Sequence, residues 1–142
     1  MKHVYVASHG NFAIGVVESL ALLIGEEHGV KPVCAYQGEI TTTEQLERVF
    51  EELVAQAEGE EVVIFTDLLG GSVNNSAARA VLRHDNVYVV AGVNLTLLLE
   101  FLLCEAQSVK EAINYATATA RESIVFINPV LQPPTEIAGD RP

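Results

Sequence analysis

The chain has 142 residues, of which 49% are hydrophobic and 19% charged, so it can fold as one ordinary domain around a packed core. Nineteen acidic against eight basic residues give a formal net charge of −11, which argues against nucleic acid and anionic membrane surfaces as partners. Cys34 and Cys104 show no metal-ligand spacing, and we expect both to be reduced core residues. The sequence predicts neither a metal centre nor a cofactor.

The N-terminus enters a strand pattern directly, without the apolar stretch and cleavage site of a secretion signal. The apolar runs around residues 15–24 and 95–104 are interrupted by Glu18 and Glu100, and they are too short to span a bilayer. We therefore expect a cytoplasmic protein that does not insert into the membrane.

Five short runs rich in β-branched residues are predicted strands: 3–7, 32–36, 61–66, 86–91 and 123–128. Apolar residues recur at helical spacing between them. Thr43, followed by Glu44 and Glu47, and Ser108, with Glu111 at capping-box spacing, mark two helix starts. The alternation predicts an α/β fold, a doubly wound and mainly parallel sheet with helices on both faces. We expect one domain over residues 1–130, followed by a Pro-rich flexible tail over 131–142.

Ligands of such sheets bind beyond the carboxyl ends of the strands. The first strand is followed by the sequence SHGN, which places the imidazole of His9 at this rim. The third strand ends in Asp67, and Gly70, Gly71 and Ser72 then precede a helix. Backbone N–H groups of a glycine loop and of a helix N-terminus form a nest suited to phosphate. The turn AGVN after the fourth strand reaches the same rim.

If the first and third strands are neighbours, His9 and Asp67 meet. A carboxylate that accepts from one ring nitrogen selects the tautomer and leaves the other nitrogen free to attack phosphorus. Gly70, Gly71 and Ser72 would then hold the phosphoryl oxygens. A purely structural interpretation stays open, in which His9 and Asp67 complete turns, the glycines form a tight turn and Ser72 is a helix cap.

Three segments, SHGNFAIGVVESLALLIGE, DLLGGSVNNSAA and GVNLTLLLE, follow one another in an order and spacing that resemble the enzyme IIA domain of the mannose-family sugar phosphotransferase system (PTS). The resemblance extends over about residues 1–130. It implies that His9 is phosphorylated, that Asp67 hydrogen-bonds its ring, and that Gly71 and Ser72 contact the phosphate. The chain differs from the family in having Val73 and Thr96 where proline is usual. We expect the loop before Val73 to be looser and the site to work.

The resemblance also implies the partners. The family accepts a phosphoryl group from the histidine-containing phosphocarrier protein and passes it to a IIB component, which serves a sugar permease. Its members are homodimers whose final strand, here 123–128, can cross to the partner subunit. Since no IIB domain follows in this chain, we expect the acceptor to be a separate protein.

Three other functions remain open. The phosphotransfer subunit of a dihydroxyacetone kinase has a similar domain, although its loop after the third-strand aspartate differs. A non-catalytic module of the IIA type would have the same fold but would sense phosphorylation and regulate a partner. A small hydrolase or nucleotide binder is the third, but the chain lacks a P-loop lysine, a GxSxG elbow and a metal cluster.

Overall fold

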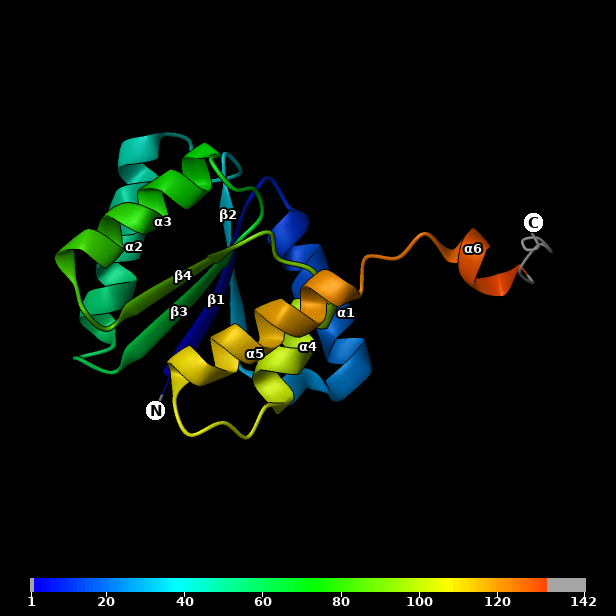
Figure 1. Cartoon of the computed structure of the whole chain (residues 1–142). Coiled ribbons are helices and arrows are strands. Elements are labelled where there is room, and N and C mark those ends of the chain that lie inside the picture. Colours follow the sequence, from blue (N-terminus) through cyan, green and yellow to red (C-terminus); the bar gives the residue numbers. More distant parts are fainter. Residues whose placement is uncertain (1, 133–142) are drawn as a thin grey trace.

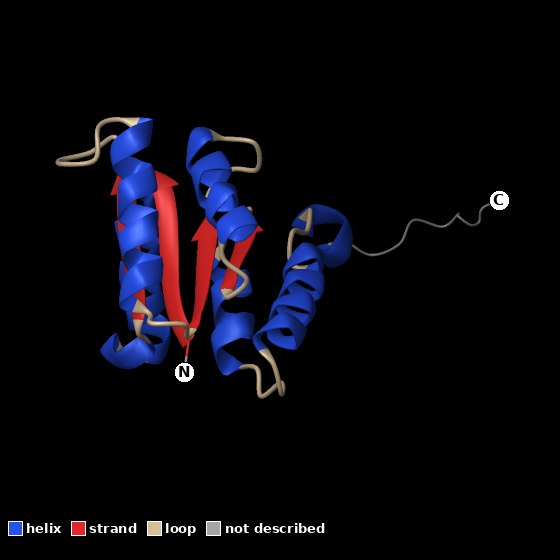
Figure 2. Ribbon diagram, turned by 90° about the vertical axis from the view of Figure 1, so that its left-hand side faces the viewer, coloured by secondary structure: helices blue, strands red, loops and turns tan. Residues whose placement is uncertain are grey.

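The computed structural model describes residues 2–132, and its centre is a four-stranded parallel sheet. The strands are β1 (Lys2–His9), β2 (Val30–Ala35), β3 (Glu61–Thr66) and β4 (Val87–Ala91), in the order β2-β1-β3-β4 (Figure 1). Their arrowheads all point to the same end of the sheet (Figure 2). Because β1 and β3 are neighbours, with Ala7 opposite Thr66, the residues that follow them lie side by side.

Helices cover both faces of this sheet, as the sequence predicts (Figure 1). α2 (Thr43–Gln56) and α3 (Ser72–Arg83) lie on one face. α1 (Phe12–Ile24) and α4 (Leu95–Leu103) lie on the other, where α5 (Val109–Glu122) packs against α4. A short 3₁₀ turn, η1 (Glu26–His28), and a last helix, α6 (Ile127–Leu131), complete the described elements. The predicted doubly wound α/β fold is confirmed.

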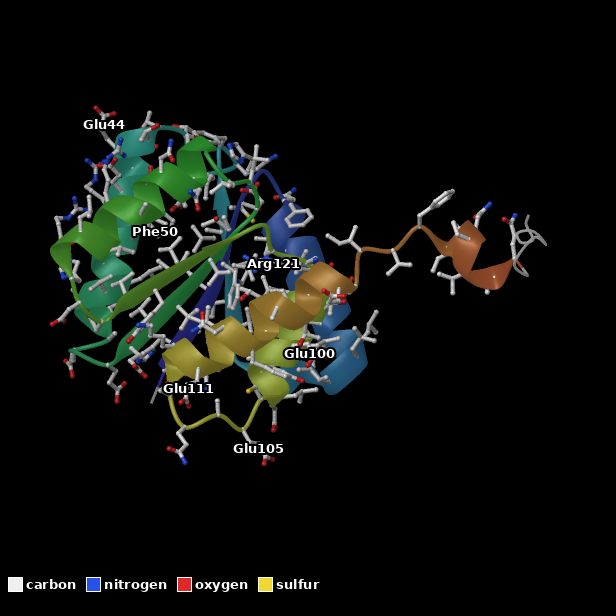
Figure 3. All side chains as sticks on the ribbon, viewed as in Figure 1. Glu44, Phe50, Glu100, Glu105, Glu111 and Arg121 are labelled. Atoms are coloured by element: carbon white, nitrogen blue, oxygen red, sulfur yellow. The ribbon has the colours of Figure 1, made fainter. Side chains whose placement is uncertain are left out.

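Successive strand residues face opposite sides and build two apolar clusters. In β3, Val63 and Phe65 pack with α1, α4 and α5, whereas Val62 and Ile64 pack beneath α2 and α3. All four side chains are fully buried, which explains why this strand is almost continuously apolar. Phe50 of α2 points toward the sheet (Figure 3). Acidic side chains point away from it in the same view: Glu44, Glu105 and Glu111.

The two predicted helix starts are found, one of them with a different cap. The hydroxyl of Ser108 accepts the N–H of Glu111 at 3.1 Å and caps α5. α2 begins at Thr43, but its cap is Thr42, whose hydroxyl accepts the N–H of Gln45 at 3.1 Å. The side chain of Gln45 accepts the N–H of Thr42 in return, at 3.0 Å, which completes a capping box.

The fifth predicted strand, 123–128, is wrong for the single chain. Ser123 follows the last turn of α5, residues 124–126 have no regular structure, and α6 begins at Ile127. The segment lies beyond α5 and away from the sheet (Figure 1), so no strand within residues 2–132 supplies the hydrogen bonds that it would need. The predicted tail begins inside α6, at Leu131, and its residues 133–142 lie outside the described part of the chain.

None of the helices within residues 2–132 has the length and apolar composition needed to cross a membrane. Over the same residues, no three side chains of His, Cys, Asp or Glu gather as a metal site requires. Cys34 and Cys104 are free thiols, and both are half-buried at the margin of the cluster beneath α1 and α4. They border the core, whereas the sequence places them inside it.

Candidate functional site

His9 and Asp67 meet at the carboxyl ends of β1 and β3. The Oδ2 atom of Asp67 accepts the backbone N–H of His9 at 2.8 Å and lies 2.9 Å from its Nδ1. Because an ionised carboxylate only accepts, Nδ1 carries the proton and Nε2 keeps its lone pair. The His9 side chain is 41% exposed and that of Asp67 only 15%. The imidazole is therefore accessible, while the group that orients it is shielded.

The second oxygen of this carboxylate makes no hydrogen bond within the described chain. Oδ1 of Asp67 is buried and has no hydrogen-bond donor among residues 2–132. Buried polar atoms normally have a partner, and exceptions in folded proteins gather where function requires them. Within the described chain, the hydrogen bonds of the Asp67 carboxylate are thus made to His9 alone.

A short turn holds His9 in place from the other side. The buried hydroxyl of Ser8 accepts the N–H of Ala13 at 2.8 Å and donates to the carbonyl of Gly10 at 3.2 Å. Gly10 has a φ of 60° and donates its N–H to the carbonyl of Ala35 at 2.8 Å. These hydrogen bonds connect the end of β1 to α1 and β2 and so fix the backbone of His9.

Gly70 and Gly71 differ in backbone conformation and in surroundings. Gly70 has a φ of 82°, which a side chain would strain. Gly71 has an ordinary φ of −73°, but a Cβ there would lie 3.1 Å from Cε1 of His9. Its N–H donates to the carbonyl of Leu68 at 3.0 Å, so it is not a free donor for an anion. Gly71 instead makes room for the imidazole.

Free donors are provided by the start of α3. Ser72 is the first residue of this helix, and its Oγ lies 3.5 Å from Nε2 of His9. The first N–H groups of a helix have no partner within it, and Gly71, in the cap position, has no side chain to accept one. A helix N-terminus also carries partial positive charge. The free nitrogen of His9 therefore faces a place suited to a phosphate.

Tyr36 completes the site, although the sequence pattern does not single it out. It follows β2 at once, whereas the predicted strand includes it. Its hydroxyl lies 2.6 Å from Oγ of Ser72, and its ring centroid is 5.6 Å from that of His9. The topology could have identified Tyr36, because the loop after the second strand lies at the same end of the sheet as the loops after the other three strands.

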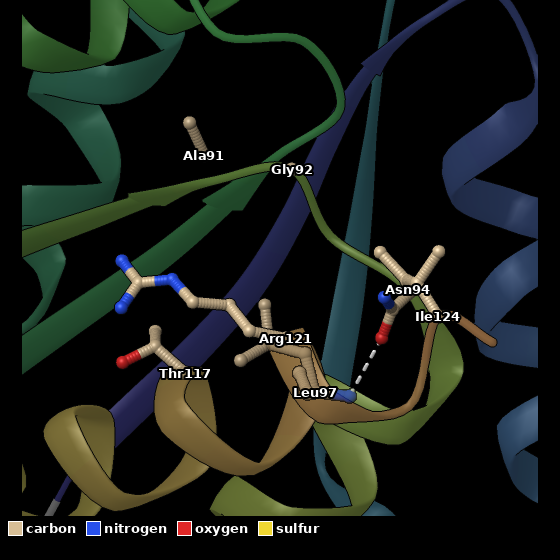
Figure 4. Close-up of a pocket in the computed structure, with 8 residues that line it drawn as sticks. Ala91, Gly92, Asn94, Leu97, Thr117, Arg121 and Ile124 are labelled. Carbon is tan, nitrogen blue, oxygen red and sulfur yellow. Dashed lines mark hydrogen bonds between the residues drawn. The ribbon is translucent and has the colours of Figure 1, made fainter.

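A cavity of about 120 Å³ lies near the end of β4 (Figure 4). Its lining residues come from β4, α4, α5 and the segments that follow β4 and α5: Ala91, Gly92, Asn94, Leu97, Thr117, Ala120, Arg121 and Ile124. The side chain of Asn94 caps α4 by accepting the N–H of Leu97 at 2.8 Å. Neither His9 nor Asp67 lines this cavity, so the predicted chemistry sits on the open rim.

Comparison with known proteins gives the family. The sequence model described as "PTS system fructose IIA component" matches residues 3–118. The chain belongs to this family. It is 34% identical to the "PTS system fructose-specific EIIA component" of Bacillus subtilis (strain 168), over 87% of this chain and 84% of that protein. The "PTS system mannose-specific EIIAB component" of Escherichia coli (strain K12) is 28% identical over 85% of this chain, which spans 38% of that longer protein.

Solved structures agree with the family. A Klebsiella pneumoniae structure assigned to the sugar phosphotransferase system matches with a TM-score of 0.82 and 32% identity, covering 92% of this IIA chain and 94% of that one. The resemblance stated from sequence is thereby confirmed, and so is the predicted class, a IIA component of the phosphotransferase system. As a IIA component, the protein is a phosphotransferase in the general sense.

Proposed function

We propose that this IIA protein accepts a phosphoryl group on Nε2 of His9 from the histidine-containing phosphocarrier protein and passes it to a IIB component. The observation that carries the proposal is the pairing of Nδ1 with Asp67, which leaves Nε2 as the nucleophile. Nε2 faces Ser72 and the start of α3, where donors for phosphoryl oxygens lie.

In this mechanism the protein contributes position and charge rather than covalent chemistry. Nε2 forms its bond to phosphorus as the bond from phosphorus to the donor's nitrogen breaks, and the electron pair of the broken bond leaves with the donor. Nδ1 keeps its proton, and Asp67 stabilises the positive charge that develops on the ring. The hydroxyl of Ser72 and the N-terminal N–H groups of α3 stabilise the phosphoryl oxygens. Transfer to the acceptor is the same step in reverse.

Transfer between proteins requires an open site with a contact surface, and the rim has both. His9 is exposed rather than enclosed in a cavity. Apolar side chains from the segments next to it are exposed as well: Phe12 at 48%, Leu68 at 59% and Leu69 at 78%. Exposed apolar side chains grouped in this way mark protein contacts. The phosphocarrier and the IIB component would dock here in turn, in the cytoplasm, and the choice of sugar belongs to the IIB component and its permease.

The test is transfer of labelled phosphate from phosphoenolpyruvate through enzyme I and the phosphocarrier. The wild-type chain should gain a phosphate that is labile in acid and stable in base, and His9→Ala should abolish it. His3→Ala is the matched control, because His3 lies on the same strand, pairs with Glu60 and should leave labelling unchanged. Asp67→Asn should slow labelling, because a neutral amide oxygen accepts Nδ1–H more weakly than a carboxylate and does not stabilise positive charge on the ring. A wild-type protein that never gains label would overturn the proposal and leave a regulatory role.

The homodimer expected from the family is also a proposal. It is supported by the exposure of the segment after α5, where Ile124 is 80% and Phe126 74% exposed, and by the position of β4 at one edge of the described sheet. In a dimer, residues 123–128 of one subunit would form a strand along β4 of the other. Light scattering should give twice the chain mass, and Phe126→Asp should give a monomer. A monomeric wild-type protein would exclude the exchange.

A further inference from the structure

Tyr36 has a strained backbone at the rim of the site. Its φ is 63°, a left-handed conformation that is an outlier for a bulky aromatic residue. The conformation is held by its N–H, which donates to the carbonyl of Ile40 at 2.5 Å, and by a bridge between Gln37 and Ile40. Strain of this kind persists where the surrounding structure requires it, and it gathers at functional sites. Here it turns the phenol ring from the end of β2 toward His9.

The hydroxyl of Tyr36 lies next to that of Ser72, which in turn lies close to the reactive nitrogen of His9. Tyr36 Oη lies 2.6 Å from Oγ of Ser72, and this Oγ lies 3.5 Å from Nε2 of His9, the outer limit of a hydrogen bond. The three side chains come from different elements, β1, the end of β2 and the start of α3. They form a row that leads from the phenol to the nucleophile.

The lone pair on Nε2 decides which hydroxyl donates. Ser72 has a single hydroxyl proton. If Ser72 donated it to Tyr36, a lone pair of Oγ would face the lone pair of Nε2, which is repulsive. If Tyr36 donates to Ser72, the proton of Ser72 is free to point to Nε2. Donation from Tyr36 to Ser72 therefore gives both Oγ of Ser72 and Nε2 of His9 a hydrogen-bond donor.

We infer that Tyr36 is a positioning residue for phosphoryl transfer: its hydroxyl holds Ser72 with the Ser72 proton aimed at Nε2 of His9. This inference rests on the proposed function of His9. As phosphorus bonds to Nε2, the Ser72 hydroxyl passes its hydrogen bond from the ring nitrogen to a phosphoryl oxygen, and no proton is transferred. Tyr36 keeps Oγ of Ser72 in place during that exchange, so only the hydroxyl proton has to turn from the ring nitrogen to the phosphoryl oxygen.

Tyr36→Phe tests this with little change of shape. It removes one hydrogen bond, so kcat for phosphorylation should fall about three- to tenfold while KM for the phosphocarrier is unchanged. A residue that served only as part of a docking surface would change KM instead. Tyr115→Phe is the control, because Tyr115 is an exposed tyrosine on α5 and its loss should leave the rate unchanged. Circular dichroism should show the same fold for all variants.

A double-variant cycle separates positioning from an independent contribution. If Tyr36 acts through Ser72, then Tyr36→Phe combined with Ser72→Ala should be no slower than Ser72→Ala alone. Effects that multiply, or a Tyr36→Phe variant with the wild-type kcat, would overturn the inference. Either outcome is distinct from failure of the proposed function, in which the wild-type protein itself gains no label.

Discussion

Replacing Gly71 with alanine should disable His9 and leave the fold intact. The backbone at this position has φ −73° and ψ 166°, which alanine adopts without strain. The added Cβ would lie 3.1 Å from Cε1 of His9 and 3.3 Å from the carbonyl oxygen of Leu68. Ordinary carbon contacts are longer than this, so the ring or the loop must move by a few tenths of an ångström.

The structure determines which of them moves. The loop is held by the hydrogen bond from the N–H of Gly71 to Leu68, and the imidazole by the hydrogen bond from Nδ1 to Asp67. The ring is a side chain with an exposed edge, so it yields first and Nε2 turns away from Ser72. A misplacement of about 1 Å at a reacting group can slow a reaction about 10²-fold. Because the displacement here is a fraction of that, we expect phosphorylation of Gly71→Ala to be slower by about tenfold, with the free energy of unfolding changed by less than about 1 kcal/mol.

The neighbouring glycine offers the control. Gly70 has a φ of 82° with no atom within 4 Å of an added Cβ, so Gly70→Ala meets backbone strain but no ring. This variant should lose about 1–2 kcal/mol of stability and keep most of its labelling rate. The assay compares initial rates of label transfer from the phosphocarrier with urea unfolding of the same samples. A wild-type rate for Gly71→Ala, or an equal slowing by Gly70→Ala, would refute the reasoning.

Three further predictions concern the stability of the fold. Phe50→Ala removes a ring that is 1% exposed under α2, and urea titration should show a loss of about 3–5 kcal/mol. Ser108→Ala removes the cap of α5, and the unfolding free energy from the same titration should fall by about 1 kcal/mol with no change in labelling. Hydrogen bonds from His84 and then Arg83 hold the pKa of the Glu51 carboxyl below its ordinary value of 4.5. Since the pKa is lower in the folded state, this carboxylate stabilises the protein above its ordinary pKa, and the contribution is lost as the pH falls through the lowered one. Glu51→Gln should therefore cost up to about 1 kcal/mol at neutral pH, because the pair is exposed and screened, and the difference from wild type in denaturation curves should vanish in acid. A difference that stays constant down to acid pH would contradict the assignment.

The sequence alone predicts the layers of the fold because its signals are local. Strands such as β3 are short and apolar throughout, helices between them repeat their apolar residues at helical spacing, and Ser108 stands at capping-box spacing from Glu111. The same local reasoning selects His9 and Asp67, since both directly follow predicted strands. It predicts the start of α2 at Thr43 but does not identify its cap, because Thr42 and Thr43 are chemically equivalent and only the hydrogen bonds distinguish them.

The tertiary structure decides what depends on residues far apart in the chain. The order β2-β1-β3-β4 brings His9 to Asp67 and the end of β2 to α3, so Tyr36 reaches Ser72, a contact that no spacing along the sequence encodes. Gly71 likewise acquires its role from a ring that stands 62 positions earlier in the chain (71 − 9 = 62). Residues 123–128 have the composition of a strand, but no strand of the described chain lies beside them. Composition and periodicity determine what a segment can form, whereas hydrogen bonds and contacts with distant segments determine what it does form.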